Sequence, residues 1–225
     1  MYHFITYATP SHIGAALNIR DSANLHGRFD TCQIYTPDDL DLDYVEKNAH
    51  ILKFPRGAGY WIWKSYVIFK HLQKINDGDV LCYCDTAYLF MSSIRNINIP
   101  TGSIPIFLTH NKPNEGSYIE KTLSKQDAFI LMDARKPRFT DTKQVWAGFV
   151  LLVKNAETLR FVSEWMNCCQ DERIVTDMPS SLIPEIPEFI ENRHDQTVLS
   201  ILAKKWNINF HDFPKDLLYN IRVPQ

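Results

Sequence analysis

The sequence predicts an α/β fold with three layers, in which helices cover both faces of a mixed, mostly parallel central sheet. Two observations support this class. Strand and helix patterns alternate along the first half of the 225 residues, which is typical of βαβ units. A hydrophobic content of 45% is enough to build a full core at this length, so one large domain is expected.

In the first half, polar and helix-breaking residues separate the expected elements. Residues 2–7 are rich in aromatic and β-branched side chains, which favour a strand. Apolar residues from Trp61 to Leu72 recur every three to four positions, the spacing of an amphipathic helix. The elements expected in this half are strands over 2–7, 32–35 and 80–84, and helices over 13–25, 38–47 and 56–72.

The second half alternates less regularly, which is why we expect a mixed sheet. Prolines at 179, 184 and 187 predict an irregular loop over 177–191 that borders a site. The other expected elements are strands over 104–108, 129–132, 145–153 and 207–213, and helices over 157–168 and 194–206. We expect a single domain over 1–225, with a nucleotide-binding part over about 1–100 and an acceptor and catalytic part over about 101–225.

Composition and charge exclude several classes of protein. A net charge of −2 with interspersed signs does not favour a nucleic-acid partner. No apolar run approaches the roughly 18 residues of a membrane span, and the first residues lack the pattern of a signal peptide. The five cysteines form no C-x-x-C pair, which indicates reduced thiols and disfavours zinc. We therefore expect a cytoplasmic protein without a membrane span.

Asp85 ends the apolar strand over 80–84, which follows a polar turn at Asp77-Gly78-Asp79. A carboxylate at the carboxyl end of a buried strand lies where open α/β sheets bind ligands. There it holds a ribose hydroxyl or a divalent cation that bridges two phosphates. The alternative is that Asp85 only caps the turn or helix that follows.

Two further segments are candidates for ligand contacts in the first half. Tyr7-Ala8-Thr9 follows the first strand, on the same sheet edge as Asp85 if the two strands are parallel, and the small Ala8 lets a planar base approach the backbone. The glycines of Arg56-Gly57-Ala58-Gly59 are expected to open a helix whose N-terminus attracts phosphate. Trp61 and Trp63 cannot both face the core of one helix, so one is expected near the ligand. Ordinary turns and an ordinary aromatic helix are the alternatives.

The second half contributes three further candidates. Trp146-Ala147-Gly148 opens an apolar strand, where small residues would let a substrate lie against the backbone, although core packing is the favoured explanation of the pattern. The polar run Arg193-His194-Asp195-Gln196 precedes a helix and follows the proline-rich loop, so it either lines a site or supplies a helix N-terminal charge. His211 is a candidate metal ligand, although a lone histidine usually is not one.

Taken in order, these motifs resemble glycosyltransferases of the GT-A fold, of the small bacterial and viral type. The resemblance is carried by Gly59-Tyr60-Trp61-Ile62-Trp63-Lys64, by Asn76-Asp77-Gly78-Asp79, by the strand ending in Asp85, by Trp146-Ala147-Gly148 and by Asp195-Gln196. It extends from Tyr2 to about Phe213.

The resemblance implies an enzyme that transfers a sugar from a nucleotide-sugar donor, UDP-linked, to a glycan or glycoprotein hydroxyl. It implies a donor site that contains Tyr7, Ala8, Thr9, Arg56, Tyr60, Lys64, Asp85, Trp146 and Gly148. The acceptor would be recognised by loops over 111–118 and 177–191.

The resemblance also implies a Mn²⁺ or Mg²⁺ ion held by a D-x-D motif, but Ala87 stands where the second acid belongs. Asp85 would then share the ion with another ligand such as His211, or the enzyme would hold no tightly bound cation. An ion would offset charge on the departing diphosphate. Without it, Arg and Lys side chains would have to do so.

Asp195, Gln196 and His194 are the candidate catalytic residues. An inverting enzyme needs a base for the acceptor hydroxyl, with Asp195 first and His194 second. A retaining enzyme would use Asp195 and Gln196 to hold the sugar, and the Asp-Gln pair resembles retaining members more closely. Two alternatives stay open: a non-catalytic carbohydrate-binding module on the same fold, and a sugar-phosphate nucleotidyltransferase.

Overall fold

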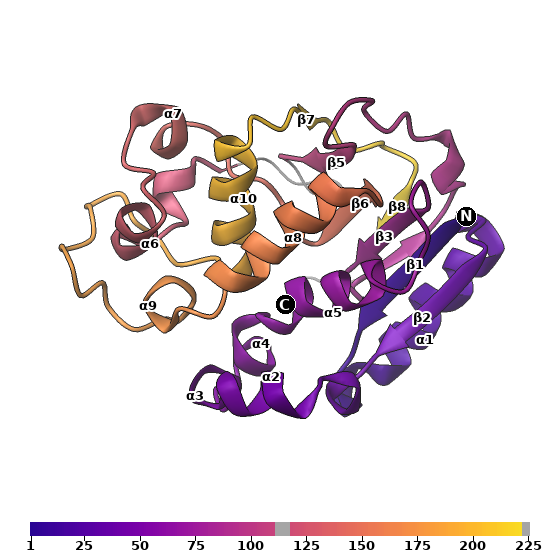
Figure 1. Ribbon diagram of the computed structural model, residues 1–225, viewed down its shortest axis with the longest axis horizontal. Helices are drawn as coiled ribbons and strands as arrows, with labels where there is room; N and C mark the ends of the chain where they lie inside the picture. Colours follow the sequence, from indigo (N-terminus) through magenta and orange to yellow (C-terminus); the bar gives the residue numbers. More distant parts are fainter. Residues whose placement is uncertain (111–117, 222–225) are drawn as a thin grey trace.

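A computed structural model of the chain describes residues 1–110 and 118–221. Its central sheet has six strands in the order β2-β1-β3-β6-β5-β7 (Figure 1). β1 pairs in parallel with β2 and β3, β5 pairs in parallel with β7, and β6 runs antiparallel to β3 and β5. The prediction of a mixed, mostly parallel sheet is confirmed. The strands are β1 Tyr2–Tyr7, β2 Thr31–Tyr35, β3 Val80–Cys84, β5 Ile106–Thr109, β6 Phe149–Val153 and β7 Phe210–His211.

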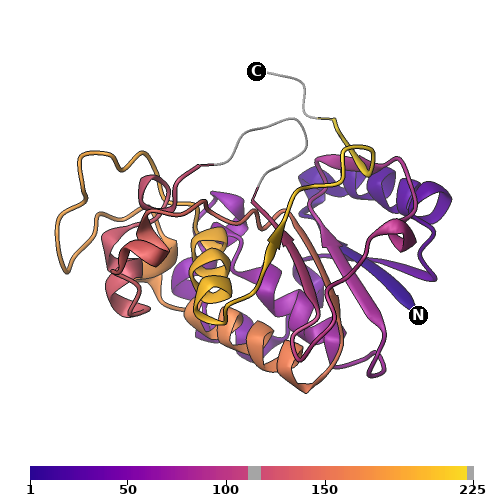
Figure 2. The same ribbon diagram turned by 90° about the horizontal axis from the view of Figure 1, so that it is seen from above.

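Helices lie on both faces of this sheet, so the predicted three layers are present (Figure 2). α5 and α8 pack together on one face, and α1 packs on the other. A small second sheet of β4 Tyr88–Phe90 and β8 Leu218–Asn220 lies on the α1 side. The helices are α1 Ile13–Ser22, α2 Leu42–Lys47, α3 Ala49–Leu52, α4 Gly57–Tyr60, α5 Trp63–Leu72, α6 Gln126–Leu131, α7 Pro137–Thr140, α8 Ala156–Cys168, α9 Glu172–Val175 and α10 Asp195–Lys205.

The strands alternate their side chains between two apolar clusters. In β3, Leu81 and Tyr83 point into the cluster under α5 and α8, whereas Cys82 and Cys84 point into the cluster under α1. This period of two is what a strand buried on both faces requires. None of the helices that the structure describes could span a bilayer, because each is too short or too polar.

The prediction of a strand over 129–132 is wrong. Phe129 belongs to α6, where it is fully buried together with Ala128. A short apolar run is compatible both with a strand and with one buried helical turn, and here the tertiary packing selects the helix. The strand expected over 145–153 begins only at Phe149, and the strand expected over 207–213 is limited to Phe210–His211. Residues 111–117 of the expected acceptor loop lie outside the described residues.

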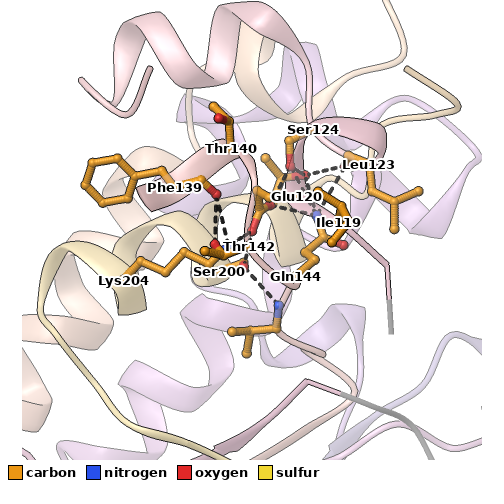
Figure 3. Close-up of polar contacts among 12 residues, drawn as sticks. Ile119, Glu120, Leu123, Ser124, Phe139, Thr140, Thr142, Gln144, Ser200 and Lys204 are labelled. Carbon is orange, nitrogen blue, oxygen red and sulfur yellow. Dashed lines mark hydrogen bonds and ion pairs between the residues drawn. The ribbon is translucent and has the colours of Figure 1, made fainter. Parts of the chain in front are cut away.

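A buried polar cluster around Glu120 anchors α10 to the segment before β6 (Figure 3). The Glu120 side chain is fully buried and accepts hydrogen bonds from Ser124 Oγ at 2.6 Å and Gln144 Nε2 at 2.9 Å. From α10, Lys204 Nζ lies 2.6 Å from Glu120 Oε2, and Ser200 Oγ donates to the same oxygen. Burial lowers the pKa of Lys204, an effect that the Glu120 charge opposes. Because α10 begins with Asp195, this cluster helps to place the N-terminus of that helix.

Replacing Glu120 by Gln should destabilise the fold strongly. The amide keeps the shape but removes the charge that balances the buried Lys204 ammonium, so we expect a loss of about 3–5 kcal/mol in the free energy of unfolding. The exposed pair Glu157–Arg160 provides a control, and Glu157→Gln should cost less than about 1 kcal/mol. Urea denaturation of both variants measures the difference, and equal losses would contradict the role of the cluster.

Candidate active site

A cavity of about 470 Å³ opens at the carboxyl ends of β1 and β3. β1 lies between β2 and β3, so the chain crosses from one side of β1 to the other at this point. In open α/β sheets ligands bind at such a switch point, outside the carboxyl ends of the strands. We call this the β1–β3 cavity; its lining residues are Tyr7, Ala8, Thr9, Ser11, His12, Pro55, Gly57, Ala58, Trp61, Trp63, Tyr83, Asp85 and Thr86.

Four of the residues that the resemblance assigns to the donor site meet in this cavity: Tyr7, Ala8, Thr9 and Asp85. They come together because β1 and β3 are parallel neighbours, with Ile5 opposite Tyr83. The Thr6 hydroxyl also donates to the Cys84 carbonyl at 2.7 Å, which ties the two strand ends together. The parallel pairing on which the sequence argument depended is therefore present.

Aromatic rings form one wall of the cavity. Tyr7 and Trp63 stack with their ring centroids 3.8 Å apart and their planes at 16°. Burial, together with the nearby Asp39 and Asp38, raises the pKa of Tyr7 to about 12, so its hydroxyl stays protonated. Trp61 and Trp63 both line the cavity, although only one of them was expected near the ligand.

The segment from Gly57 to Trp61, which contains the four-residue element α4, is a single left-handed turn beside these rings and not a right-handed helix. Its five consecutive φ angles are all positive: 58°, 49°, 92°, 55° and 60°. The N–H of Tyr60 donates to the Arg56 carbonyl at 2.8 Å, which closes the turn. A left-handed conformation costs about 1–2 kcal/mol for each residue that has a Cβ, and such strain is concentrated at functional sites.

The expectation that these glycines open a helix and offer its N-terminus to phosphate is wrong. The right-handed helix α5 begins only at Trp63, after the turn. Gly59 has φ +92°, and a Cβ there would lie 2.7 Å from the Leu52 backbone. The glycines therefore permit the left-handed turn, and no local pattern distinguishes that use from a helix start.

Lys64 is buried between two carboxylates at the floor of the site. Its Nζ lies 3.0 Å from Asp195 Oδ2 and 3.4 Å from Asp85 Oδ1. The Tyr83 hydroxyl donates to the same Asp85 oxygen at 2.8 Å. Lys64 comes from α5, Asp85 from the end of β3 and Asp195 from the start of α10. Three elements thus converge on one ammonium group.

The pKa values in this cluster respond to burial and to the opposite charges. Burial alone would lower the pKa of Lys64, but the carboxylates of Asp195 and Asp85 raise it overall, so the ammonium stays charged. Burial raises the pKa of Asp195 to about 6, an effect that Lys64 partly offsets. Of these three residues only Asp85 lines the cavity, and its side chain is 24% exposed.

The residues around Asp85 do not fit a tightly held Mn²⁺ or Mg²⁺ ion. Ala87 is buried in the apolar cluster under α1, and one Asp85 oxygen already faces both Tyr83 and Lys64. Within residues 1–110 and 118–221, no three Asp, Glu, His or Cys side chains are grouped as metal ligands. A cation at this carboxylate would depend on water and phosphate for nearly all of its ligands.

His211 does not join Asp85 in this structure. β7, which contains His211, lies three strands from β3, about 14 Å across the sheet. The His211 ring stacks on Phe107 in the cluster under α1, whereas the Tyr83 side chain that holds Asp85 points to the opposite face. No pattern in the sequence could separate the two faces of an edge strand two residues long.

His194 and Gln196 flank Asp195 and are held by other parts of the fold. His194 Nδ1 donates to the Val175 carbonyl at 2.7 Å, and burial lowers the pKa of His194 to about 4, so the ring is neutral near pH 7. His194 has φ 56° and ψ −119°, a strained conformation directly before Asp195. Gln196 accepts from the Ala147 N–H at 3.1 Å and donates to Gln144 at 2.7 Å. Both side chains position the start of α10.

Four other residues singled out in the sequence do not line the β1–β3 cavity. Arg56 forms ion pairs with Asp177 and Glu191, and Tyr60 packs against Phe54 and His194. Trp146 packs against Tyr88 and Phe213 in the cluster under α1. A Cβ on Gly148 would lie 2.4 Å from the Trp146 ring, so this glycine makes room for tryptophan.

Several cavity residues were missed in the sequence. Ser11, His12 and Pro55 line the cavity, but they lie in irregular segments that no spacing rule singles out. The Lys64–Asp195 pair joins residues 131 positions apart in the chain. Only the folded chain brings them together.

Comparison with known proteins gives similarity in structure but not in sequence. No known protein family and no curated protein matches the sequence. The chain is similar to mouse xyloside xylosyltransferase 1 in its apo form, at 12% identity and a TM-score of 0.49, over 94% of this chain and 84% of that one. It is also similar to a glycosyltransferase involved in the glycosylation of the major capsid of PBCV-1, at 13% identity and a TM-score of 0.46, over 94% of this chain and 81% of that one.

Replacing Gly59 by Ala should destabilise the left-handed turn. Because φ is +92° and the added Cβ would meet the Leu52 backbone at 2.7 Å, we expect a loss of at least about 2 kcal/mol in the free energy of unfolding. Gly14 in α1 is the matched control, since a Cβ there has no neighbour within 4 Å. Gly14→Ala should stabilise by about 0.5–1 kcal/mol. Urea denaturation distinguishes the two, and a neutral Gly59→Ala would contradict the strained turn.

The stability of the fold should depend on the ionisation of Asp195. The folded state raises its pKa from 3.8 to about 6, so this group favours folding most below about pH 4. That contribution is lost as the pH rises through about 6, and it amounts to about 3 kcal/mol. Lowering the pH from about 7 to about 4 should therefore favour the wild type over Asp195→Asn by most of this amount. Denaturation at both pH values measures it. The control Asp43→Asn, at an exposed position, should show the same pH dependence of the free energy of unfolding as the wild type. If Asp195→Asn also shows the wild-type pH dependence, the raised pKa of Asp195 is refuted.

Proposed function

We propose that this chain is a glycosyltransferase that moves a sugar from a nucleotide-linked donor to a hydroxyl acceptor. The observation that carries the proposal is the β1–β3 cavity, where Asp85 lies with Tyr7, Trp61 and Trp63 at a strand switch point. Flat aromatic rings suit stacking of a nucleobase, and a carboxylate accepts hydrogen bonds from ribose hydroxyls. Its volume of about 470 Å³ falls in the range of small-molecule sites.

The buried cluster of Lys64 with its two acids supports a role in handling a charged leaving group. A diphosphate gains negative charge as the bond to the sugar breaks. Lys64 Nζ, 3.4 Å from Asp85, reduces the negative charge that this acid presents to the ligand. Asp195 holds the ammonium from the other side at 3.0 Å, so its proposed role here is to position Lys64.

We further propose a UDP-linked donor and retention of configuration. The UDP-linked donor rests on the resemblance of the ordered motifs, and retention rests on the resemblance of the pair Asp195-Gln196. The non-catalytic binding module remains the second candidate, and the observation that favours it is Ala87 in place of a second acid.

UDP should bind the wild type, and Asp85→Asn should weaken that binding. Loss of a charged hydrogen-bond acceptor corresponds to a dissociation constant about tenfold higher or more, measured by calorimetry. The exposed Asp43→Asn should bind like the wild type. Because Asp85 is the only carboxylate among the described lining residues, EDTA should change the affinity by less than about threefold.

Turnover then separates the candidate functions. Release of UDP from a UDP-sugar, with water or an added acceptor, supports the glycosyltransferase. Binding without turnover of any nucleotide-sugar indicates the binding module, and pyrophosphate release from a nucleoside triphosphate and a sugar phosphate indicates the nucleotidyltransferase. If no nucleoside diphosphate binds, the proposal fails.

A further inference from the structure

A second cavity lies between the irregular loop over 177–192 and the start of α6. Its volume is about 240 Å³, and we call it the Lys125 cavity. It shares no lining residue with the β1–β3 cavity. Its lining residues are Lys125, Asp177, Met178, Pro179, Glu185, Phe189, Ile190, Glu191 and Asn192.

Lys125 is the unusual member of this group. Its side chain is only 2% exposed, and Nζ is buried without a hydrogen-bond partner among the described residues. Burial lowers the pKa of Lys125, although Asp127, Glu185 and Asp177 act in the opposite direction. A buried ammonium without a hydrogen-bond partner destabilises the fold. A ligand oxygen that accepts a hydrogen bond from it would remove this free-energy cost.

The carboxylates around the cavity are already paired with other groups. Asp177 and Glu191 form ion pairs with Arg56 at 3.0 and 3.2 Å, and Glu191 forms another with Arg193 at 2.6 Å. Glu185 accepts from the Gln126 N–H at 3.0 Å and from the Ser180 hydroxyl. Among the described residues, none of these acids lies within ion-pair distance of Lys125. The acids therefore surround the cavity without neutralising its ammonium.

This combination of groups suits a neutral polyhydroxylated ring. Carboxylates repel an anionic ligand and the ammonium repels a cationic one, whereas a hydroxyl both donates to a carboxylate and accepts from an ammonium. Phe189 and Ile190 add apolar surface for the C–H face of a ring. A volume of about 240 Å³ is below the usual range for drug-sized ligands, so it suits a single ring.

The Lys125 cavity is linked to the β1–β3 cavity through two residues. Arg56 lies between Pro55 and Gly57, which line the β1–β3 cavity, and it binds Asp177 and Glu191 of the Lys125 cavity. The His194 ring stacks on Trp61 at 5.3 Å, and its Nε2 lies 3.8 Å from Asp177. A ligand in the Lys125 cavity would thus lie next to the segment that leads into Asp195.

We propose that the Lys125 cavity binds one neutral sugar unit of the acceptor, with the Lys125 ammonium donating to a ring hydroxyl. This inference rests on the proposed glycosyl transfer, for which it assigns the class of acceptor. It places acceptor recognition on a buried cation in the loop region and not on the exposed rim of the β1–β3 cavity.

Saturation-transfer NMR with methyl glycosides of xylose, glucose, galactose and mannose tests the proposal. We expect at least one glycoside to bind the wild type, and Lys125→Met to bind it at least about tenfold more weakly. Lys125→Gln, which keeps a donor, should retain part of the binding. Lys136→Met, at an exposed lysine in the second half of the chain, should bind like the wild type.

Two further readouts exclude a merely structural effect. The melting temperature of Lys125→Met should equal or exceed that of the wild type, because a buried unpaired charge is removed. UDP affinity should not change, so failure of UDP binding in the wild type would count against the proposed function and not against this cavity. Equal glycoside binding by Lys125→Met would overturn the inference. So would the absence of binding by every glycoside, or displacement of a bound glycoside by inorganic phosphate.

Discussion

The buried ammonium of Lys64 is the contact on which the rest of the site depends. Removing a charge from water is costly unless opposite charges lie close to it. Here Asp195 at 3.0 Å and Asp85 at 3.4 Å meet that requirement, and each comes from a different element. α5, the end of β3 and the start of α10 must therefore keep their relative positions. The charge that Asp85 presents to the cavity therefore depends on the Lys64 ammonium next to it.

The surrounding structure holds these three elements in place at some cost. Glu120 ties α10 to the segment before β6 through Ser200 and Lys204. The left-handed turn before α5 lies next to Lys64 in the chain, and the strained His194 before α10 lies next to Asp195. Strain of this kind persists only where neighbouring contacts outweigh it, and it is typical of ligand sites. The backbone is thus strained, at a cost in folding free energy, at the starts of the two helices that bring Lys64 and Asp195 together.

The same constraint links the two cavities. Arg56 and His194 connect the aromatic wall near Trp61 to the acids of the loop over 177–192. A ligand in one cavity would therefore be in indirect contact with the residues that line the other.

The sequence alone determined the class of fold, most strands and helices, and the meeting of Tyr7-Ala8-Thr9 with Asp85, because periodicity and parallel strand ends are local or nearly local properties. It misread the glycines at 57 and 59 and the run at Phe129, where the same residues suit two backbone conformations and long-range packing selects one. Only the tertiary structure could place His211 away from Asp85, pair Lys64 with Asp195, and leave Lys125 Nζ buried without a hydrogen-bond partner among the described residues. Those relations join residues far apart in the chain, and their energies depend on burial, which no spacing along a sequence records.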